Sequence, residues 1–247
     1  MPTEAALLAL GFGAFLLGGA VKGTLGIGLP MVAVPLLSLF IPATQAIVLM
    51  MMPVVLSNIW QAWDSGDARV YLRRFAPMLG WLVVTTLLTV PVTLAMSPRV
   101  LNASVALIVL IAVLLLSLQL KLPVTSSNEG WWSAGVGALS GVMGGVSSLT
   151  GPLVISYLVA LKLPRDAFVG SISIIYLFAG VPLYGAMAWH GRVGWIEVLL
   201  STLALLPMAL GLWLGRRVRH RISEAGFRRA LLAFLCAVAL ALILKQP

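Results

Sequence analysis

Charged residues are scarce in this sequence. Only 9% of its 247 residues are charged, whereas about a quarter are charged in an average soluble domain. Apolar residues make up 61% of the chain, and the mean hydropathy is +1.08. A chain of this composition has too few polar side chains to cover a folded surface in water. The composition therefore excludes a soluble globular domain and predicts an integral membrane protein.

Groups suited to catalysis and metal binding are also scarce. The single cysteine, Cys236, excludes an intrachain disulfide and a cysteine-based metal cluster. The two histidines, His190 and His220, lie at the edges of apolar runs without the partners of a metal site. No Asp or Glu lies deep in an apolar run, so the carboxylate relay of many pumps is not expected. The sequence has no nucleophile–base arrangement and no Walker-type phosphate loop. We therefore expect no enzyme activity, no metal and no cofactor.

A secretory signal is not expected at the N-terminus, because the stretch before Gly11 carries Glu4 and no Lys or Arg. The net charge of +9 comes from basic residues placed between apolar runs rather than on one folded face. Their expected partner is the anionic cytoplasmic leaflet of a lipid bilayer, not a nucleic acid.

Long apolar runs fill most of the chain, and they lie at about 5–40, 43–63, 75–96, 100–120, 132–161, 167–189, 194–215 and 227–244. Six of these eight runs have close to the roughly 20 residues that a helix needs to cross the hydrocarbon. The runs 5–40 and 132–161 are too long for one straight crossing. We expect an all-α integral membrane protein.

The two long runs carry glycines and prolines at matching positions. A shift of 122 residues superimposes four pairs: Gly19 and Gly141, Gly23 and Gly145, Pro30 and Pro152, and Pro42 and Pro164. Matched interruptions in two halves of an apolar chain indicate an internal repeat and point to a transporter's binding site. We predict one membrane domain made of two repeats, residues 1–122 and 123–247. Each repeat would contain a broken or re-entrant helical segment and three transmembrane helices.

The arm that follows each break is short. Pro30 to Phe40 is 11 residues, which as a helix covers roughly 16 Å, about half the hydrocarbon thickness. Each long run can therefore be a broken, tilted crossing helix or a hairpin that returns from mid-membrane. A hairpin in the second run places twelve Lys and Arg on one side and three on the other, with Lys22 inside the membrane. Loop charge therefore favours a hairpin there and does not decide the first run.

If both runs are hairpins, the two repeats have opposite orientations in the membrane, as in many secondary transporters. Both termini would then lie outside, and the loop around residues 162–166 would lie in the cytoplasm.

The residues around the breaks are the candidate binding groups. Unwound backbone at membrane depth must face protein or a wet cavity, so its amides can serve as donors. The arms would also point the positive ends of their dipoles to mid-membrane, where two such ends meeting would bind a small anion. The candidate substrate-binding residues are Lys22, Gly23, Thr24, Gly26 and Gly28 in the first half and Gly145, Ser147, Ser148, Thr150 and Gly151 in the second.

The segments after the breaks add polar groups that could line the same cavity: Ser57, Asn58, Gln61, Ser171, Ser173, Tyr176 and Tyr184. Of these seven residues, we predict that Asn58 and Tyr176 line the cavity and contact the substrate. The glycines before the breaks and Lys22 each have an alternative explanation. The spacing of Gly19, Gly137 and Gly141 favours close helix packing, and Lys22 could extend its amine to the interface rather than serve a site.

The duplicated glycine-rich block, the eight-run hydropathy and the length resemble the sulfite exporter TauE/SafE family of bacterial membrane transporters. The residues that carry the resemblance are Gly19, Gly23, Gly26, Gly28 and Pro30, their counterparts Gly141, Gly145, Gly151 and Pro152, and also Pro164 and Gly170. The resemblance implies a multi-pass exporter or permease of the bacterial inner membrane. It also implies a small anionic substrate, such as sulfite, sulfoacetate or a related organosulfonate.

We therefore expect a carrier that works by alternating access around a mid-membrane site, with proton coupling as an open alternative. An anion channel with the same residues as its filter, or a membrane subunit without transport of its own, are the other hypotheses. The sequence makes no prediction of the oligomeric state.

Overall fold

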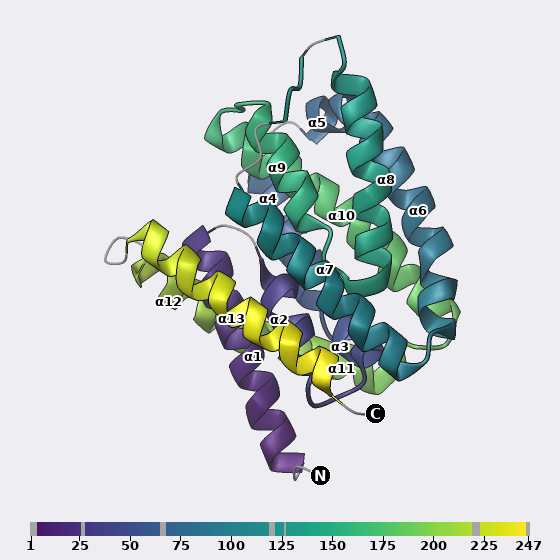
Figure 1. Ribbon diagram of the computed structural model, residues 1–247, viewed down its shortest axis with the longest axis vertical. Coiled ribbons are helices and arrows are strands. Elements are labelled where there is room, and N and C mark those ends of the chain that lie inside the picture. Colours follow the sequence, from purple (N-terminus) through teal and green to yellow (C-terminus); the bar gives the residue numbers. More distant parts are fainter. Residues whose placement is uncertain are drawn as a thin grey trace. The chain divides into compact units, whose positions relative to one another are not determined.

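The computed structural model describes residues 4–25, 28–64, 68–118, 122–125, 127–218 and 223–245. Within these residues the regular structure is helical and contains no strand, which confirms the predicted all-α fold. The helices in chain order (Figure 1) are α1 (Glu4–Leu25), α2 (Leu29–Ser38), α3 (Ala43–Val48), α4 (Met51–Asp64), α5 (Ala68–Arg74), α6 (Ala76–Ala95), α7 (Pro98–Leu118), α8 (Glu129–Ser147), α9 (Gly151–Ala160), α10 (Arg165–Trp189), α11 (Trp195–Leu203), α12 (Leu205–Val218) and α13 (Glu224–Leu244).

Seven stretches of the described chain are long and apolar enough to cross a membrane: Glu4–Thr24, Ala43–Asp64, Ala76–Ala95, Pro98–Leu118, Asp166–Trp189, Trp195–Val218 and Gly226–Leu244. Helix α8 has 19 residues but does not belong to this set, because its many Gly and Ser residues lower its hydropathy. The expectation of a multi-pass membrane protein is confirmed.

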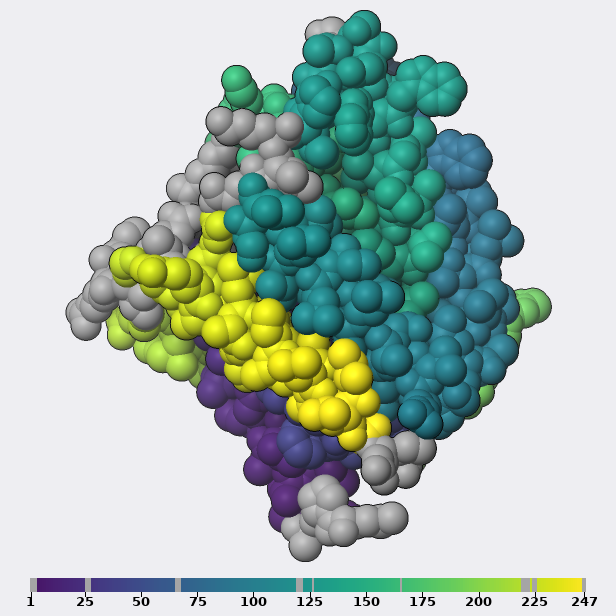
Figure 2. All heavy atoms as spheres, in the orientation of Figure 1, coloured from purple at the N-terminus to yellow at the C-terminus, as the bar shows by residue number. Residues whose placement is uncertain are grey.

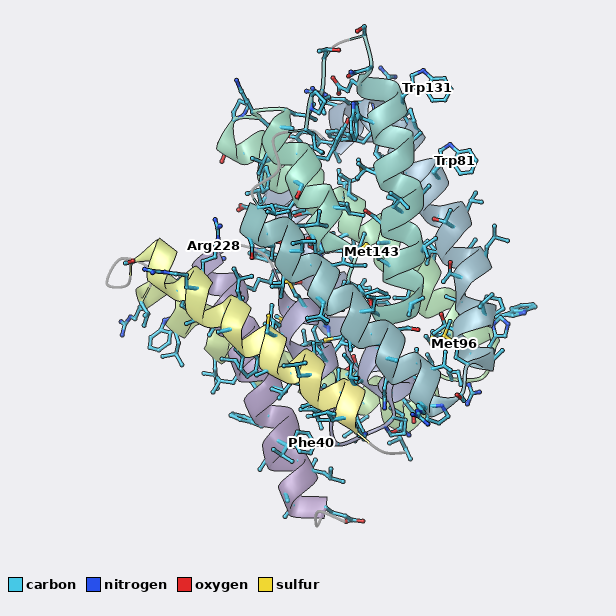
Figure 3. All side chains as sticks on the ribbon, in the orientation of Figure 1. Phe40, Trp81, Met96, Trp131, Met143 and Arg228 are labelled. Atoms are coloured by element: carbon cyan, nitrogen blue, oxygen red, sulfur yellow. The ribbon has the colours of Figure 1, made fainter. Side chains whose placement is uncertain are left out.

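The outer side chains suit a lipid environment. Figure 2 shows α13, in yellow, lying on the surface, and its Leu240, Ile243 and Leu244 side chains are exposed. Tryptophans near helix ends project away from the chain. Figure 3 shows this for Trp131 at the start of α8, which is 84% exposed, and for Trp81 near the start of α6. Exposed tryptophans at helix ends are typical of a membrane–water interface.

Both long apolar runs are broken into two helices. The first is divided into α1 and α2, and the second into α8 and α9, with residues 148–150 between the latter pair. The shorter helices α2 and α9 have 10 residues each, so each is about 15 Å long, half the hydrocarbon thickness. A Cβ added at Gly18 in α1 would meet Leu29 and Ala33 of α2, so α2 folds back along α1.

The helices before the breaks extend further than the sequence analysis predicts. Lys22, Gly23 and Thr24 remain in α1, and Gly145 and Ser147 remain in α8. A buried helix keeps its backbone groups bonded, so the irregular stretch of the second run shrinks to residues 148–150, where Ser148 is left-handed and Pro152 follows.

Proline also divides two of the runs predicted as single crossings. Pro53 has no N–H to donate to the Leu49 carbonyl, and the run 43–63 breaks there into α3 and α4. The Leu49 oxygen accepts a hydrogen bond from the Ser201 hydroxyl instead, at 2.9 Å. Pro207 has the same effect on the Leu203 carbonyl, where α11 ends and α12 begins.

The chain forms two compact units. The first unit contains residues 1–53, 96–113 and 192–247, and the second contains 54–95 and 114–191. Each unit therefore takes segments from both halves of the sequence. The two repeats and their inverted orientation stay predictions.

In the first unit, α1 packs against α12 through glycines of both helices. A Cβ added at any of these glycines would collide with a backbone carbonyl of the other helix: Gly19 with Met208, Gly23 with Leu212, Gly211 with Leu16, and Gly215 with Ala20. Such backbone contact requires small residues, as is common between membrane helices.

In the second unit, α6 and α8 pack in the same way. Gly137 and Gly141 lie against the Met78 and Leu82 carbonyls, which confirms the packing role predicted for Gly19, Gly137 and Gly141. The Thr93 hydroxyl of α6 donates to the Gly145 carbonyl of α8 at 3.1 Å, so a hydrogen bond joins the two helices at the end of their contact.

Candidate functional site

We call residues 22–28 the first elbow and residues 145–151 the second elbow. The first elbow belongs to the first unit and the second elbow to the second unit. Their geometry is given separately for each.

In the first elbow, Lys22 lies in the last turn of α1 and is only 6% exposed, with the guanidinium of Arg216 in α12 close enough to repel its charge. The Thr24 hydroxyl hydrogen bonds to the Ala20 and Val21 carbonyls, each at 3.0 Å, so it donates to its own helix. Gly23 lies in the contact with α12. These positions favour packing and local bonding over direct substrate contact for Gly23 and Thr24.

Gly28 precedes α2 with a φ of 105°, a left-handed conformation that favours glycine. Its carbonyl accepts the first helical hydrogen bond, from Val32 N at 3.2 Å. Gly26 lies outside the described residues, so its predicted role stays a prediction. At the other end of α2, Lys245 Nζ donates to the Ser38 carbonyl at 2.8 Å, which places a cation at the negative end of the helix.

In the second elbow, α8 ends at Ser148, which has a φ of 61°. Its N–H donates to the Gly144 carbonyl at 2.7 Å, and its hydroxyl lies 3.2 Å from the hydroxyl of Tyr184 in α10. The Ser147 hydroxyl donates to the Met143 carbonyl at 2.7 Å and accepts from Leu149 N at 3.2 Å. Ser147 therefore closes the end of the helix. In the Ser148–Tyr184 pair one hydroxyl donates to the other, which leaves one hydroxyl proton for a further partner.

Helix α9 begins at Gly151 directly after this turn. Its N-cap residue Thr150 makes no side-chain capping bond. The first-turn amides of a helix lack partners within the helix, and they lie at the positive end of its dipole. A Cβ added at Gly151 would lie 2.5 Å from the Tyr176 hydroxyl, so this hydroxyl contacts the start of α9. Among the described residues, the hydroxyls of Thr150 and Tyr176 have no hydrogen-bond partner.

Asn58 lies on the face of α4 that meets α10. Its Nδ2 donates to the Val54 carbonyl one turn earlier, at 2.7 Å, and the side chain is 2% exposed. Val54 contacts Gly180, and the Ser173 hydroxyl lies 3.5 Å from Gln61 Oε1. Residues 54, 58 and 61 share one face of α4. Because Val54 lies opposite Gly180 and Gln61 lies opposite Ser173, Asn58 lies between these two contacts, at the height of Tyr176 along α10.

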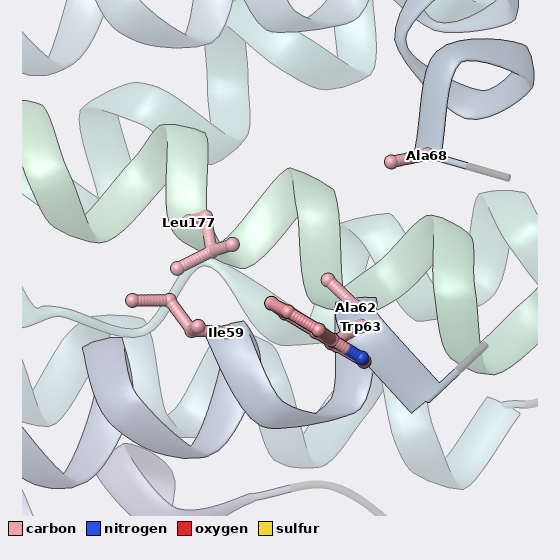
Figure 4. Close-up of a pocket in the computed structure, with 5 residues that line it drawn as sticks. All are labelled: Ile59, Ala62, Trp63, Ala68 and Leu177. Atoms are coloured by element: carbon pink, nitrogen blue, oxygen red, sulfur yellow. The ribbon is translucent and has the colours of Figure 1, made fainter. Parts of the chain in front are cut away.

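The next residue of each helix agrees with this position of Asn58 opposite Tyr176. Ile59 and Leu177 line the same open hollow, of about 390 Å³, together with Ala62, Trp63 and Ala68 (Figure 4). Its lining residues are apolar, and none of the candidate substrate-binding residues is among them.

The second unit therefore brings together residues that are far apart in the sequence: Ser148 and Thr150 between α8 and α9, Gly151 of α9, and Tyr176 and Tyr184 of α10. Asn58 of α4 lies at the level of Tyr176 along α10. The sequence analysis did not choose Tyr184. Its distance of eight residues from Tyr176, which places both on one helix face, is the signal that could have identified it.

The described residues contain no cluster of three or more His, Cys, Asp or Glu that could hold a metal ion. An ion pair in the second unit joins Arg74 Nε to Glu129 Oε1 at 2.8 Å, at the start of α8 and at the opposite end of this helix from the elbow. The hydrogen bond to the Glu129 carboxylate raises the pKa of Arg74 above its ordinary value. What gathers at the second elbow is thus a set of neutral hydroxyls, amides and one carboxamide, which suits binding rather than acid–base catalysis.

A comparison with protein-family models matches residues 10–242 to the family described as sulfite exporter TauE/SafE. The comparison with curated proteins gave no match, and neither did the comparison with solved structures.

Proposed function

Because the chain belongs to the sulfite exporter TauE/SafE family of membrane transporters, we propose that its second elbow binds a small oxyanion during transport. The substrate would be sulfite or a related organosulfonate, and the protein would work as an exporter or permease in the inner membrane of a bacterial cell. The same proposal holds that it catalyses no reaction.

One observation carries this proposal. The hydroxyls of Thr150 and Tyr176 lie at the start of α9 and have no partner among the described residues, beside first-turn amides that are also free of helical bonds. Compact oxyanions are held by such donors, and the positive end of a helix dipole adds a favourable field. In the low dielectric of a membrane interior these interactions are stronger than in water.

We propose transport by alternating access, with the elbow of each unit taking part. Broken helices whose positive ends serve a site are a recurring feature of secondary transporters. In the first elbow, Lys22 would contribute positive charge. A buried cation in an apolar helix is costly, and such residues often serve transport.

Counterflow in proteoliposomes tests the proposal. Vesicles with purified protein and preloaded with unlabelled sulfite should accumulate labelled sulfite transiently, because a carrier exchanges the two across the membrane. Flux that neither saturates nor shows counterflow would instead support an anion channel. If no small anion crosses, the hypothesis of a non-transporting subunit replaces both.

A further inference from the structure

The buried carboxamide of Asn58 has one group that the fold leaves unused. Its Nδ2 is bonded to the Val54 carbonyl, but its Oδ1 has no hydrogen-bond partner among the described residues. The bond from Nδ2 fixes which atom points to the backbone, because a nitrogen must face a carbonyl oxygen. The unused atom is therefore an acceptor, and a buried acceptor without a donor is unfavourable.

Four other buried oxygens also lack partners in the described chain: Ser133 Oγ, Ser140 Oγ, Tyr157 OH and Ser171 Oγ. Each belongs to a hydroxyl, which can rotate and act as donor or acceptor. The Asn58 oxygen differs because it can only accept. It is also at the level of Tyr176, whose hydroxyl contacts the start of α9.

With Asn58 at the level of Tyr176, an anion held at the second elbow would meet several donors and one fixed acceptor. An anion whose outer atoms are all acceptors would satisfy Thr150 and Tyr176, but it would place a lone pair against Asn58 Oδ1. An anion that carries a hydrogen of its own would satisfy both kinds of group.

We propose that Asn58 Oδ1 accepts a hydrogen bond from the bound substrate, so that the site selects oxyanions that carry a hydrogen-bond donor. A monoprotonated oxyanion such as hydrogen sulfite is the simplest ion of this kind. This inference rests on the proposed function and adds to it the protonation state of the substrate. It also means that a proton crosses with each anion without a carboxylate or imidazole side chain at the second elbow to carry it.

Binding of two matched ions tests the proposal. Hydrogen sulfite and methanesulfinate have the same charge and nearly the same shape, but the first has a hydroxyl where the second has a methyl group. Calorimetry on the purified full-length protein, at a mildly acidic pH where sulfite is mainly monoprotonated, should show tighter binding of hydrogen sulfite by about tenfold or more.

Two variants locate the effect. Asn58→Leu has a similar volume without the acceptor, so the ratio of the two dissociation constants should fall close to one. Ser133→Ala removes a buried hydroxyl that also lacks a partner but lies at the far end of α8, and it should leave the ratio unchanged.

Equal binding of the two ions by the wild type would overturn the role of Asn58 while leaving the proposed function intact. A water molecule that serves Asn58 in place of the substrate would give this result. An unchanged ratio in Asn58→Leu would overturn it as well. If the wild type bound neither ion nor any other small oxyanion, the proposed function itself would fail. The two dissociation constants of the wild type test the proposal even if Asn58→Leu does not fold.

Discussion

At the scale of single residues, Ser148 shows how the second elbow is made. It ends α8 in a left-handed conformation, a position where glycine is the usual residue. An L-residue is less stable in this conformation by about 1–2 kcal/mol. Serine here provides the hydroxyl that pairs with Tyr184, which glycine could not provide.

This conflict predicts an order of stability for two variants. Ser148→Gly and Ser148→Ala both remove the hydroxyl, but only the glycine variant relieves the backbone. We expect the free energy of unfolding to be about 1 kcal/mol larger for the glycine variant than for the alanine variant, so the glycine variant is the more stable one. Denaturation in detergent measures the difference. An alanine variant as stable as the glycine variant would mean that Ser148 is not held in the left-handed conformation.

The sequence could predict part of the site at this scale. Glycine, serine and proline in a long apolar run indicated the second elbow, and Tyr176 was chosen because it is polar in the helix that follows. The sequence could not predict which hydroxyls remain available. Thr24 and Ser147 have the same chemistry as Thr150, but both donate to carbonyls of their own helix. That choice depends on the local turn, which only the folded backbone determines.

At the scale of helices, glycine contacts hold each unit together. The pairs α1 with α12 and α6 with α8 both bring backbone against backbone. The spacing of the glycines predicted such packing, but it could not identify the partner helices. Glycine spacing describes one surface only, and the partner is fixed by the fold as a whole.

Gly211 gives a direct test of the contact between α1 and α12. In Gly211→Ala the new methyl group would collide with the Leu16 carbonyl, so the helices must separate. We expect a loss of about 1–3 kcal/mol in the free energy of unfolding. Gly13→Ala on α1 is the matched control, because nothing lies within 4 Å of its added Cβ and alanine favours the helix. Equal stability of the two variants would refute the close approach.

At the scale of the whole molecule, the basic residues predict the orientation in the membrane. Lys162 lies just before α10 and Arg165 is its first residue, whereas only Arg192 follows it closely. Helix α10 has 25 residues, enough to cross the hydrocarbon. From the excess of positive charge at the start of α10 we predict that this end of the helix faces the cytoplasm.

Cysteine labelling measures this orientation. Cys236 is first replaced by alanine, and one new cysteine is then introduced at an exposed position, Asp166→Cys in the first turn of α10 or His190→Cys directly after its end. An impermeant thiol reagent applied to intact cells should label only the second variant, and permeabilised cells should allow both to react. Labelling of Asp166→Cys alone in intact cells would reverse the orientation.

The fold class, the breaks and the apolar spans could be predicted because each depends on local composition. The division into two compact units could not, since each unit combines segments from both halves of the chain. Contacts between residues so far apart in sequence leave no local pattern.

The central claim is that the second elbow holds the anion, and Gly151 tests it most directly. In Gly151→Ala the added methyl group displaces the Tyr176 hydroxyl from the start of α9, while Gly185→Ala on α10 meets nothing within 4 Å. Equilibrium binding of labelled sulfite to the purified proteins should be saturable in the wild type and in Gly185→Ala, and weaker by about tenfold or more in Gly151→Ala. Equal affinities in all three proteins would contradict the account.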